Sequence, residues 1–318
     1  MLAKHLLASL AAVASITAYA QSYPQKPIHA IVPYGVGQAT DVMCRVFLER
    51  VRSALNQTVV IENRPGAGGN IGAAEAARAA PDGYTVLCTG NATHISNPFV
   101  YENMGLDPEK DLQPVSAVAG TGYVLLVNNK YKGKSLADII AMAKAAPKPL
   151  TMGAASTTAQ VLYAMFTDAA KIQLVRVPYA AGNATLFTDL MRGDVDLVIE
   201  AMPSAMAPIN NGQVTAIAVT NPVRTPFLPD VPTFKESGVD LTLVGWNAFY
   251  VPKGTPVEVV ATLNRAANEA LKDPDVKKRF ATVASEPIGG TPNELQAMIK
   301  ADRGLFEPRI KALGLKAQ

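Results

Sequence analysis

Short apolar runs alternate with amphipathic segments along most of this chain. The runs are nearly continuous in apolar residues, which is typical of parallel strands covered on both faces. The expected strands cover residues 28–33, 58–62, 84–89, 123–128, 150–154, 174–179, 195–200 and 214–220. The expected helices cover residues 41–55, 70–80, 135–146, 157–170 and 184–192. This alternation predicts an α/β fold.

The pattern divides into two α/β units. Residues 221–245 are rich in proline and turn signals, and the chain after residue 245 is expected to be helical. Two helices of this last segment are expected to start at Thr255 and Thr291. Each threonine is followed directly by proline, and a glutamate stands three residues after the threonine. The chain passes between the units near residues 123 and 245. Two passages predict two lobes with a cleft, one from 21–123 plus 246–318 and one from 124–245. A single large α/β domain is the alternative.

The first 20 residues have the layout of a secretory signal peptide. Lys4 precedes an apolar stretch from Leu6 to Ile16, and Ala18-Tyr19-Ala20 follows. The pattern predicts export to the periplasm, with cleavage near Ala20. A membrane anchor is the alternative, but this apolar stretch is short for a bilayer. The mature protein is expected to be soluble.

Charge and cysteine content exclude several classes of function. The net charge is +3, charged residues make up 17% of the chain, and no dense Lys/Arg tract occurs, so nucleic-acid binding is not expected. The two cysteines, Cys44 and Cys88, cannot form a C-x-x-C motif. They are expected either to form a disulfide or to remain two buried thiols. We expect no metal and no cofactor.

Catalysis finds little support in the sequence. After removal of the leader the chain has two histidines, His29 in the first strand and His94 in a loop, and neither G-x-S-x-G nor H-E-x-x-H occurs. His29 is expected in the core. His94, near Asn91 and Thr93 at the end of a strand, is expected either to donate to a ligand or to be solvated in its loop. We expect no catalytic residue, and a secreted hydrolase is a remote alternative.

The turn Pro33-Tyr34-Gly35-Val36-Gly37-Gln38-Ala39-Thr40-Asp41 is the strongest candidate for a binding site. It joins a strand to a helix, with Thr40 or Asp41 expected as the N-cap. Backbone N–H groups and the positive end of a helix dipole meet in such a turn, so it attracts an anion.

Other turns offer further polar groups. Residues 64–72 are close to a dinucleotide fingerprint, but Ile71 stands in place of its third glycine, and a close approach of helix to sheet is the better interpretation. Ser156, Thr157 and Thr158 open a helix, where they either bind a carboxylate or only cap the helix. Glu200 closes a strand and is expected to accept from a ligand hydroxyl, an amine or water. Phe249, with Trp246 and Asn247, forms either an apolar wall or core.

Several stretches resemble the extracytoplasmic solute receptors of tripartite tricarboxylate transporters, the Bug family. They are PYGVGQATD (33–41), VIENRPGAGG (60–69), PDGYT (81–85), VPY (177–179), LPDVPT (228–233) and PKGTP (252–256). The resemblance implies a type II periplasmic-binding-protein fold, with two lobes, a ligand cleft and two crossover segments. It also implies a small organic acid as ligand: a di- or tricarboxylate, an acidic amino acid, or an aromatic carboxylate of the terephthalate type.

The resemblance further implies delivery of the ligand to membrane transporter subunits, and we expect the protein to be a monomer. An output to a membrane sensor kinase is the alternative. This chain departs from the family's glycine-rich turns at Gln38 and at Ser156, so ligand identity does not transfer from any one relative. The candidate ligand-binding residues, including Glu200 and Phe249 from above, are Tyr34, Gly35, Gly37, Gln38, Thr40, Asp41, Asn91, Thr93, His94, Ser156, Thr157, Thr158, Tyr179, Ala181, Gly182, Asn183, Glu200 and Phe249.

Overall fold

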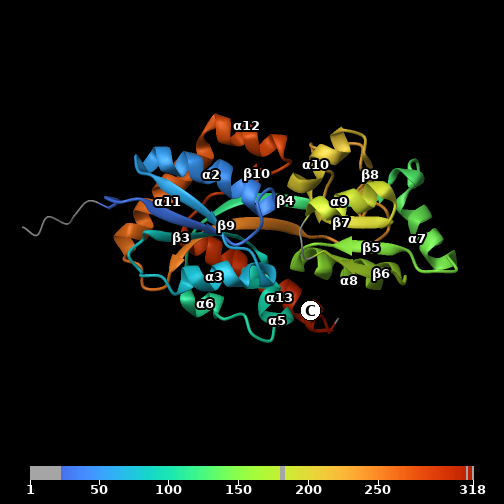
Figure 1. Cartoon of the computed structure of the whole chain (residues 1–318), viewed down its shortest axis with the longest axis horizontal. Helices are drawn as coiled ribbons and strands as arrows, with labels where there is room; N and C mark the ends of the chain where they lie inside the picture. The colour runs from blue at the N-terminus through green and yellow to red at the C-terminus, as the bar shows by residue number, and fades with distance from the viewer. Residues whose placement is uncertain (1–22, 180–182, 313, 317–318) are drawn as a thin grey trace, which may run out of the picture.

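The computed structural model describes residues 23–179, 183–312 and 314–316, so the expected signal peptide lies outside the described residues. The chain forms two lobes side by side along its long axis (Figure 1). A mixed sheet connects them, with strand order β2-β1-β3-β9-β4-β7-β5-β6 and with β8 and β10 both paired to β4. We call the part built on β1, β2, β3, β9, β10 and the start of β4 lobe 1, and the rest lobe 2.

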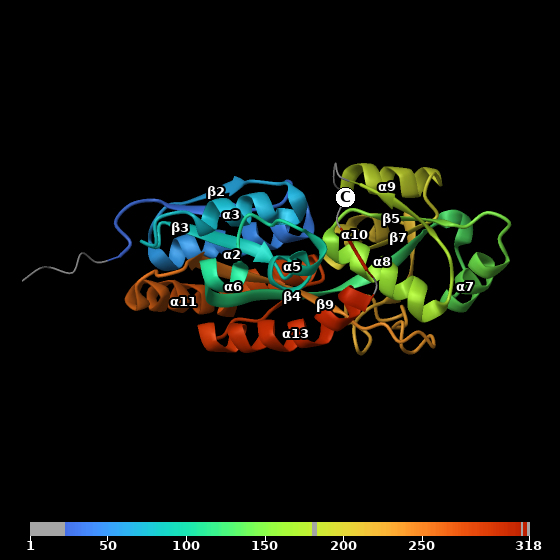
Figure 2. The same cartoon turned by 90° about the horizontal axis from the view of Figure 1, so that it is seen from below.

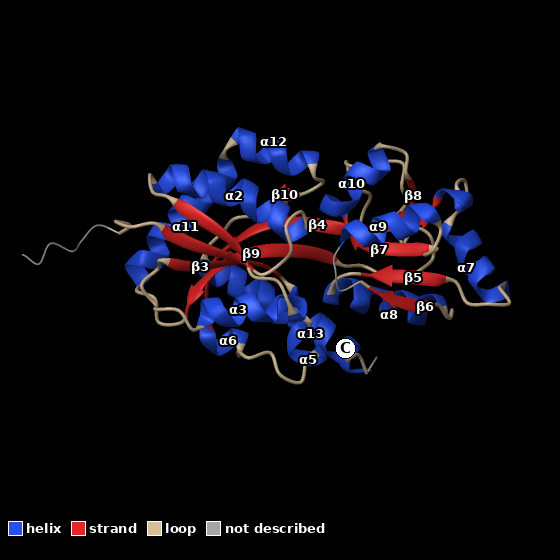
Figure 3. Cartoon of the chain, in the orientation of Figure 1, coloured by secondary structure: helices blue, strands red, loops and turns tan. Residues whose placement is uncertain are grey.

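The strands occupy the cores of both lobes (Figure 3). Their bounds are β1 Ile28–Val32, β2 Val59–Asn63, β3 Thr85–Gly90, β4 Leu112–Asn128, β5 Thr151–Ala154, β6 Val175–Pro178, β7 Leu197–Ala201, β8 Val214–Val219, β9 Val244–Pro252 and β10 Glu286–Pro287. The longer helices are α2 Ala39–Leu55, α3 Asn70–Ala77, α7 Leu136–Ala145, α8 Thr157–Ala170, α9 Asn183–Arg192, α10 Met202–Asn210, α11 Val257–Lys272, α12 Pro274–Thr282 and α13 Pro292–Ala312. Short turns of helix are η1 Ala67–Gly69, α4 Ala92–Ile95, α5 Asn97–Val100, α6 Pro108–Asp111 and η2 Asn129–Tyr131.

Strand β4 carries the chain from one lobe to the other, as Figure 2 shows from below. As far as Gly122 it pairs antiparallel with β9, and from Tyr123 onward it pairs with β7 and β8. The pairing partners therefore change within one continuous strand. The chain returns to lobe 1 at Val244, where β9 begins.

Lobe 1 is a sheet between two helical layers, because its strands bury both faces. Ile28, Ala30 and Val32 pack on the side of α2 and α11, whereas Ile31 packs on the side of α3 and α13. Strands of this kind read as nearly continuous apolar runs, as the sequence does here. The parallel register of β1 with β2 and β3 places the ends of β1 and β3 at one edge of the sheet.

Lobe 2 repeats this arrangement around β5, β6, β7 and the end of β4. Helices α7 and α8 cover one face through Ile139 and Phe166, and α9 and α10 cover the other through Leu186 and Met206. Both lobes thus have cores of their own, and the edges where strands turn into helices face each other.

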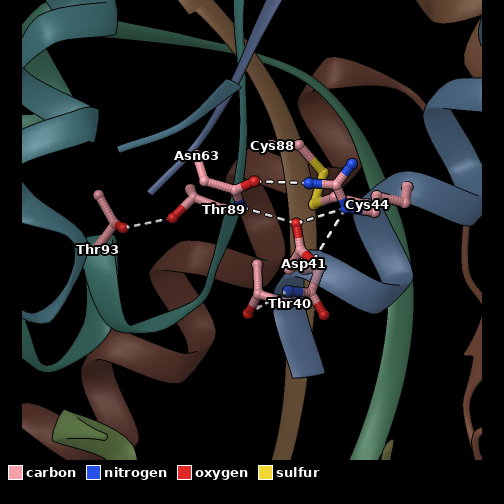
Figure 4. Close-up of a disulfide and its surroundings, with 9 residues drawn as sticks. Thr40, Asp41, Cys44, Asn63, Cys88, Thr89 and Thr93 are labelled. Carbon is pink, nitrogen blue, oxygen red and sulfur yellow. Dashed lines mark hydrogen bonds and ion pairs between the residues drawn. A yellow bond between two sulfur atoms is a disulfide. The ribbon is translucent and has the colours of Figure 1, made fainter. Parts of the chain in front are cut away.

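Cys44 and Cys88 form a disulfide that ties α2 to β3 (Figure 4). Their Cα atoms are 6.0 Å apart. The sequence left open whether these cysteines form a disulfide or remain two buried thiols, and the structure contains the disulfide. The bridge fixes the start of α2, and with it the turn at 33–38, to the centre of the lobe 1 sheet.

Four expectations about the fold were wrong. Strand β4 starts at Leu112 rather than near residue 123, and residues 244–252 form strand β9, where only helices were expected. Thr291 caps α13 as expected, but α11 starts at Val257 and the Thr255 hydroxyl donates to the carbonyl of Pro252 instead of capping. His29 is exposed and paired with Glu62, not buried in the core.

None of the described helices is long and apolar enough to cross a membrane.

Candidate functional site

A cavity of about 440 Å³ lies between the two lobes. From lobe 1 it is lined by the turn that opens α2, by residues 65–69 and by the end of β3. From lobe 2 it is lined by the start of α8 and the ends of β6 and β7. The cavity therefore lies where strands of both sheets end and helices begin, the usual place for a ligand in α/β proteins.

The first turn arranges its own polar groups around the cavity. The Gly35 N–H donates to Gln38 Oε1 at 3.0 Å, so the Gln38 side chain folds back over the turn. Gln38 is also the N-cap residue of α2, which corrects the expectation of Thr40 or Asp41. Helix α2 starts at Ala39, so the N–H groups of its first turn have no partner within the helix. This end of the helix lines the cavity.

Asp41 holds this turn from behind. It is buried, and its carboxylate accepts from the Gly37 N–H at 2.9 Å, from Arg45 Nε at 2.9 Å and from Asn63 Nδ2 at 2.8 Å. Asn63 also donates to the carbonyl of Tyr34. Figure 4 shows the hydrogen bond that joins Asn63 to Asp41. Gly37 and Asp41 thus shape the turn but do not line the cavity, contrary to expectation.

Residues 66–69 form a second wall that sequence reasoning assigned only to close packing. That packing is present, since a Cβ on Gly72 would lie 2.7 Å from the carbonyl of Arg64. However, Gly66, Ala67, Gly68 and Gly69 also line the cavity. Asn97 anchors them by donating to the Gly68 carbonyl at 3.0 Å.

Lobe 2 presents the start of α8. The Ser156 hydroxyl caps the helix by accepting from the Ala159 N–H at 3.1 Å, and Ser156, Thr157 and Thr158 all line the cavity. Capping and lining therefore coexist. Tyr123, on β4, contributes a hydroxyl beside Thr158; burial raises its pKa, so the phenol stays protonated.

Charge is sparse in the cavity. Among the described lining residues, only Arg176 and Glu200 are charged. Arg176 Nη1 donates to Gln160 Oε1 at 2.7 Å, which positions the guanidinium along α8. Burial raises the pKa of Glu200 to about 7. No group of three or more potential metal ligands occurs in the described part of the chain.

The structure brings ten of the candidate residues to the cavity: Tyr34, Gly35, Gln38, Thr40, Asn91, Ser156, Thr157, Thr158, Tyr179 and Glu200. Ala181 and Gly182 lie outside the described residues. Asn183 is the first residue of α9.

Thr93, His94 and Phe249 do not line the cavity, contrary to expectation. His94 is 2% exposed and stacks on Tyr250 with ring centroids 4.6 Å apart, so it neither reaches a ligand nor is solvated. Burial lowers its pKa to about 4. Thr93 is buried with its hydroxyl 2.9 Å from that of Thr89, and Phe249 packs in the core against Phe47.

Sequence reasoning also missed several lining residues. They include Tyr101, Thr121, Tyr123, Gln160 and Arg176, together with residues 65–69. Trp246 and Asn247 also line the cavity. Trp246 is a buried member of the core and its indole donates to Asp302 at 2.6 Å, and Asn247 donates to the Thr40 hydroxyl at 3.0 Å. The sequence indicated that these two residues lie near the cleft only through their position at the start of β9, where the chain was expected to return to lobe 1.

The chain matches a known receptor family along most of its length. The model of the tripartite tricarboxylate transporter family receptor matches residues 43–315. Protein BugT of Bordetella pertussis is 35% identical over 301 residues, which cover 93% of this chain and 92% of BugT.

Two solved structures share the whole architecture. The periplasmic binding protein BugD superposes with a TM-score of 0.86 at 30% identity, covering 93% of this chain and 100% of BugD. A protein of R. palustris solved with adipate superposes with a TM-score of 0.88 at 30% identity, again covering 93% and 100%. The expected type II periplasmic-binding-protein fold is thereby confirmed. This chain belongs to the tripartite tricarboxylate transporter receptor family and is a solute-binding protein of that family.

Proposed function

We propose that this protein captures a small organic carboxylate in the periplasm and delivers it to the membrane subunits of a transporter. One observation carries the proposal: α2 of lobe 1 and α8 of lobe 2 both begin at the same cavity. Each helix start presents N–H groups without intrahelical partners and the positive end of a dipole. Two such ends converging from opposite lobes suit an anion.

The composition of the cavity fits a carboxylate better than a larger or more highly charged anion. Its positive character comes from backbone dipoles and from Arg176 alone among the described lining residues. The hydroxyls of Thr157 and Thr158 supply further donors. A volume of about 440 Å³ suits a compact ligand. Adipate, the ligand named for the R. palustris neighbour, is of this class.

We further propose that residues 21–123 plus 246–318 and residues 124–245 act as two bodies that close on the ligand. The change of pairing partners between Gly122 and Tyr123, and the return at Val244, supply two crossings near which hinges would lie. Ligand contacts from both bodies would then stabilise the closed form. Export and cleavage near Ala20 would place the receptor in the periplasm.

A thermal-shift screen of the mature protein against mono-, di- and tricarboxylates and acidic amino acids tests the proposal. A ligand present at 100 times its Kd stabilises the protein by about 2.7 kcal/mol. Absence of any shift across the panel would refute the proposed function.

Two helix caps in lobe 2 provide matched variants. Ser156→Ala removes the cap of α8 at the cavity, and Ser135→Ala removes the cap of α7, which does not line it. Both lose about 1 kcal/mol of stability. Only Ser156→Ala should also raise the Kd of the carboxylate.

A further inference from the structure

Glu200 stands apart from the other groups of the cavity. It lies near the end of β7, is 4% exposed and lines the cavity. Its Oε1 accepts from the N–H of Ala201 at 2.9 Å. Its Oε2 is buried and has no hydrogen-bond partner in the described part of the chain. A buried acceptor without a partner is costly, because desolvation of the oxygen is not offset.

The neighbouring groups do not supply the missing donor. Arg176 directs its guanidinium to Gln160 and forms no ion pair with Glu200 among the described residues. The Tyr123 hydroxyl, from the adjacent strand β4, has its pKa raised by burial and by the Glu200 carboxylate, but it forms no hydrogen bond with Glu200 Oε2 among the described residues. The Tyr179 hydroxyl, from the end of β6, donates to Asp189. The Oε2 atom of Glu200 thus has no donor among the described residues of the fold, and it belongs to a side chain that lines the cavity.

We propose that Glu200 accepts a hydrogen bond from a donor on the ligand, and that the receptor therefore selects carboxylates that also carry a hydroxyl or an ammonium group. This inference rests on the proposed function and narrows its ligand class. The ligand carboxylate would lie at the helix starts, and its donor would meet Glu200 at the end of β7.

A plain dicarboxylate is the competing ligand. Its second carboxylate would meet Glu200 in a poorly solvated cavity, where like charges repel, unless Glu200 took up a proton and donated it. Of the described residues that line the cavity, the other charged or titratable ones are Tyr34, Tyr101, Tyr123, Tyr179 and Arg176, and the Glu200 carboxylate influences the pKa of Tyr123. Burial raises the pKa of Glu200 to about 7. The two ligand classes therefore predict opposite effects of pH, which makes them separable.

Matched ligand series test the proposal by isothermal titration calorimetry. Each series holds a dicarboxylate and its 2-hydroxy and 2-amino derivatives, with four-, five- and six-carbon backbones. In the best-bound series the wild type should bind a donor-bearing member about 10- to 100-fold more tightly than the plain one. Affinity for the 2-amino member should rise between pH 6 and pH 8, as Glu200 ionises.

Two variants assign the effect to Glu200. Glu200→Gln keeps size and one acceptor oxygen, so it should lose the preference for the ammonium group and the pH dependence while keeping a preference for the hydroxyl. Glu200→Leu should lose both preferences. Urea unfolding of each variant checks that it is folded. If Glu200→Leu fails to fold, Glu200→Gln still tests the inference, because glutamine matches glutamate in shape.

The outcomes separate this inference from the proposed function. If plain dicarboxylates bind at pH 8 as tightly as their 2-hydroxy and 2-amino derivatives, the inference is overturned and the proposed function stands. If Glu200→Gln leaves the ammonium preference unchanged, Glu200 is not its source and the inference is again overturned. Binding of no carboxylate would overturn both.

Discussion

A methyl group on Gly68 should obstruct closure of the lobes. Gly68 belongs to the η1 turn of lobe 1 and has φ +62°. A Cβ at this position would lie 2.5 Å from Thr157 Oγ1, across the cavity in lobe 2, and 2.6 Å from the Tyr101 hydroxyl. Thr157 is only 4% exposed, so its side chain has little room to move away. Gly68→Ala therefore perturbs a point at which the two lobes touch.

Two costs of the substitution can be separated. The left-handed backbone conformation disfavours any residue with a Cβ by about 1–2 kcal/mol, and this penalty applies whether the lobes are open or closed. The overlap with the Tyr101 hydroxyl lies within lobe 1, so it adds to this first cost in both forms. The overlap with Thr157 adds about 1–3 kcal/mol, as in an overpacked core, but only when the lobes are together. The first cost lowers the free energy of unfolding of the ligand-free protein. The second raises the Kd for the carboxylate by about 5- to 150-fold.

The assay compares Gly68→Ala with Gly212→Ala. Gly212 has φ +65°, and a Cβ there would have no neighbour within 4 Å, so this control carries the backbone penalty without the overlap. Urea unfolding measures the first cost in both variants, and calorimetric titration measures the second. Gly68→Ala should cost less affinity in the Thr157→Ala variant than in the wild type, because Thr157→Ala removes the atom nearest to the added Cβ.

Equal affinities of the Gly68→Ala and Gly212→Ala variants would refute this reasoning. Such a result would mean that the ligand-bound form does not bring Gly68 and Thr157 as close as the structure does. Additive effects of Gly68→Ala and Thr157→Ala on affinity would likewise show that the two residues do not act through contact with each other.

Three further predictions concern lobe 1. Replacing Cys44 and Cys88 by alanine should lower the free energy of unfolding by about 4 kcal/mol, because the disulfide closes a loop of 44 residues; an unchanged urea midpoint would contradict this. Asp41→Ala leaves the Gly37 N–H without its acceptor, so it should cost about 1–3 kcal/mol of stability and also weaken carboxylate binding, measured by urea unfolding and calorimetry. His94 has its pKa lowered from 6.5 to about 4, so the unfolded state binds more protons as the pH falls below about 6.5, and stability falls by about 3 kcal/mol by pH 4. His94→Phe should remove this loss. Because burial raises the pKa of Glu200 to about 7, that carboxyl changes stability in the opposite direction over the same pH range, so the test compares the variant with wild type. An equal change in urea midpoint between pH 7 and pH 4.5 in both proteins would exclude the His94 effect.

The fold could be predicted where one physical signal dominated. Strands buried on both faces, such as β1 and β7, are nearly continuous apolar runs bounded by turns, and they were expected within two residues of their observed bounds. The first part of β4 gave no such signal, because Pro114 and small residues interrupt it. The structure accommodates them with register shifts near Pro114 and Ala117, where the ladder to β9 is irregular. Tertiary pairing with β9 therefore makes this segment a strand, and local sequence does not.

The site divides along a similar line. Helix starts are local features, so the turns at Tyr34 and Ser156 could be placed at the cavity from sequence alone. Tyr101, Tyr123 and Arg176 reach it only because distant elements meet there, and their own neighbours in sequence carry no sign of it. The prediction that His94 binds the ligand was wrong for the opposite reason. His94 follows the end of a strand, as a binding residue does, but α4 turns its ring onto Tyr250. The direction of a side chain after a strand is set by the next turn of backbone, so sequence gives the edge of the sheet where a ligand would bind but not which residues face it.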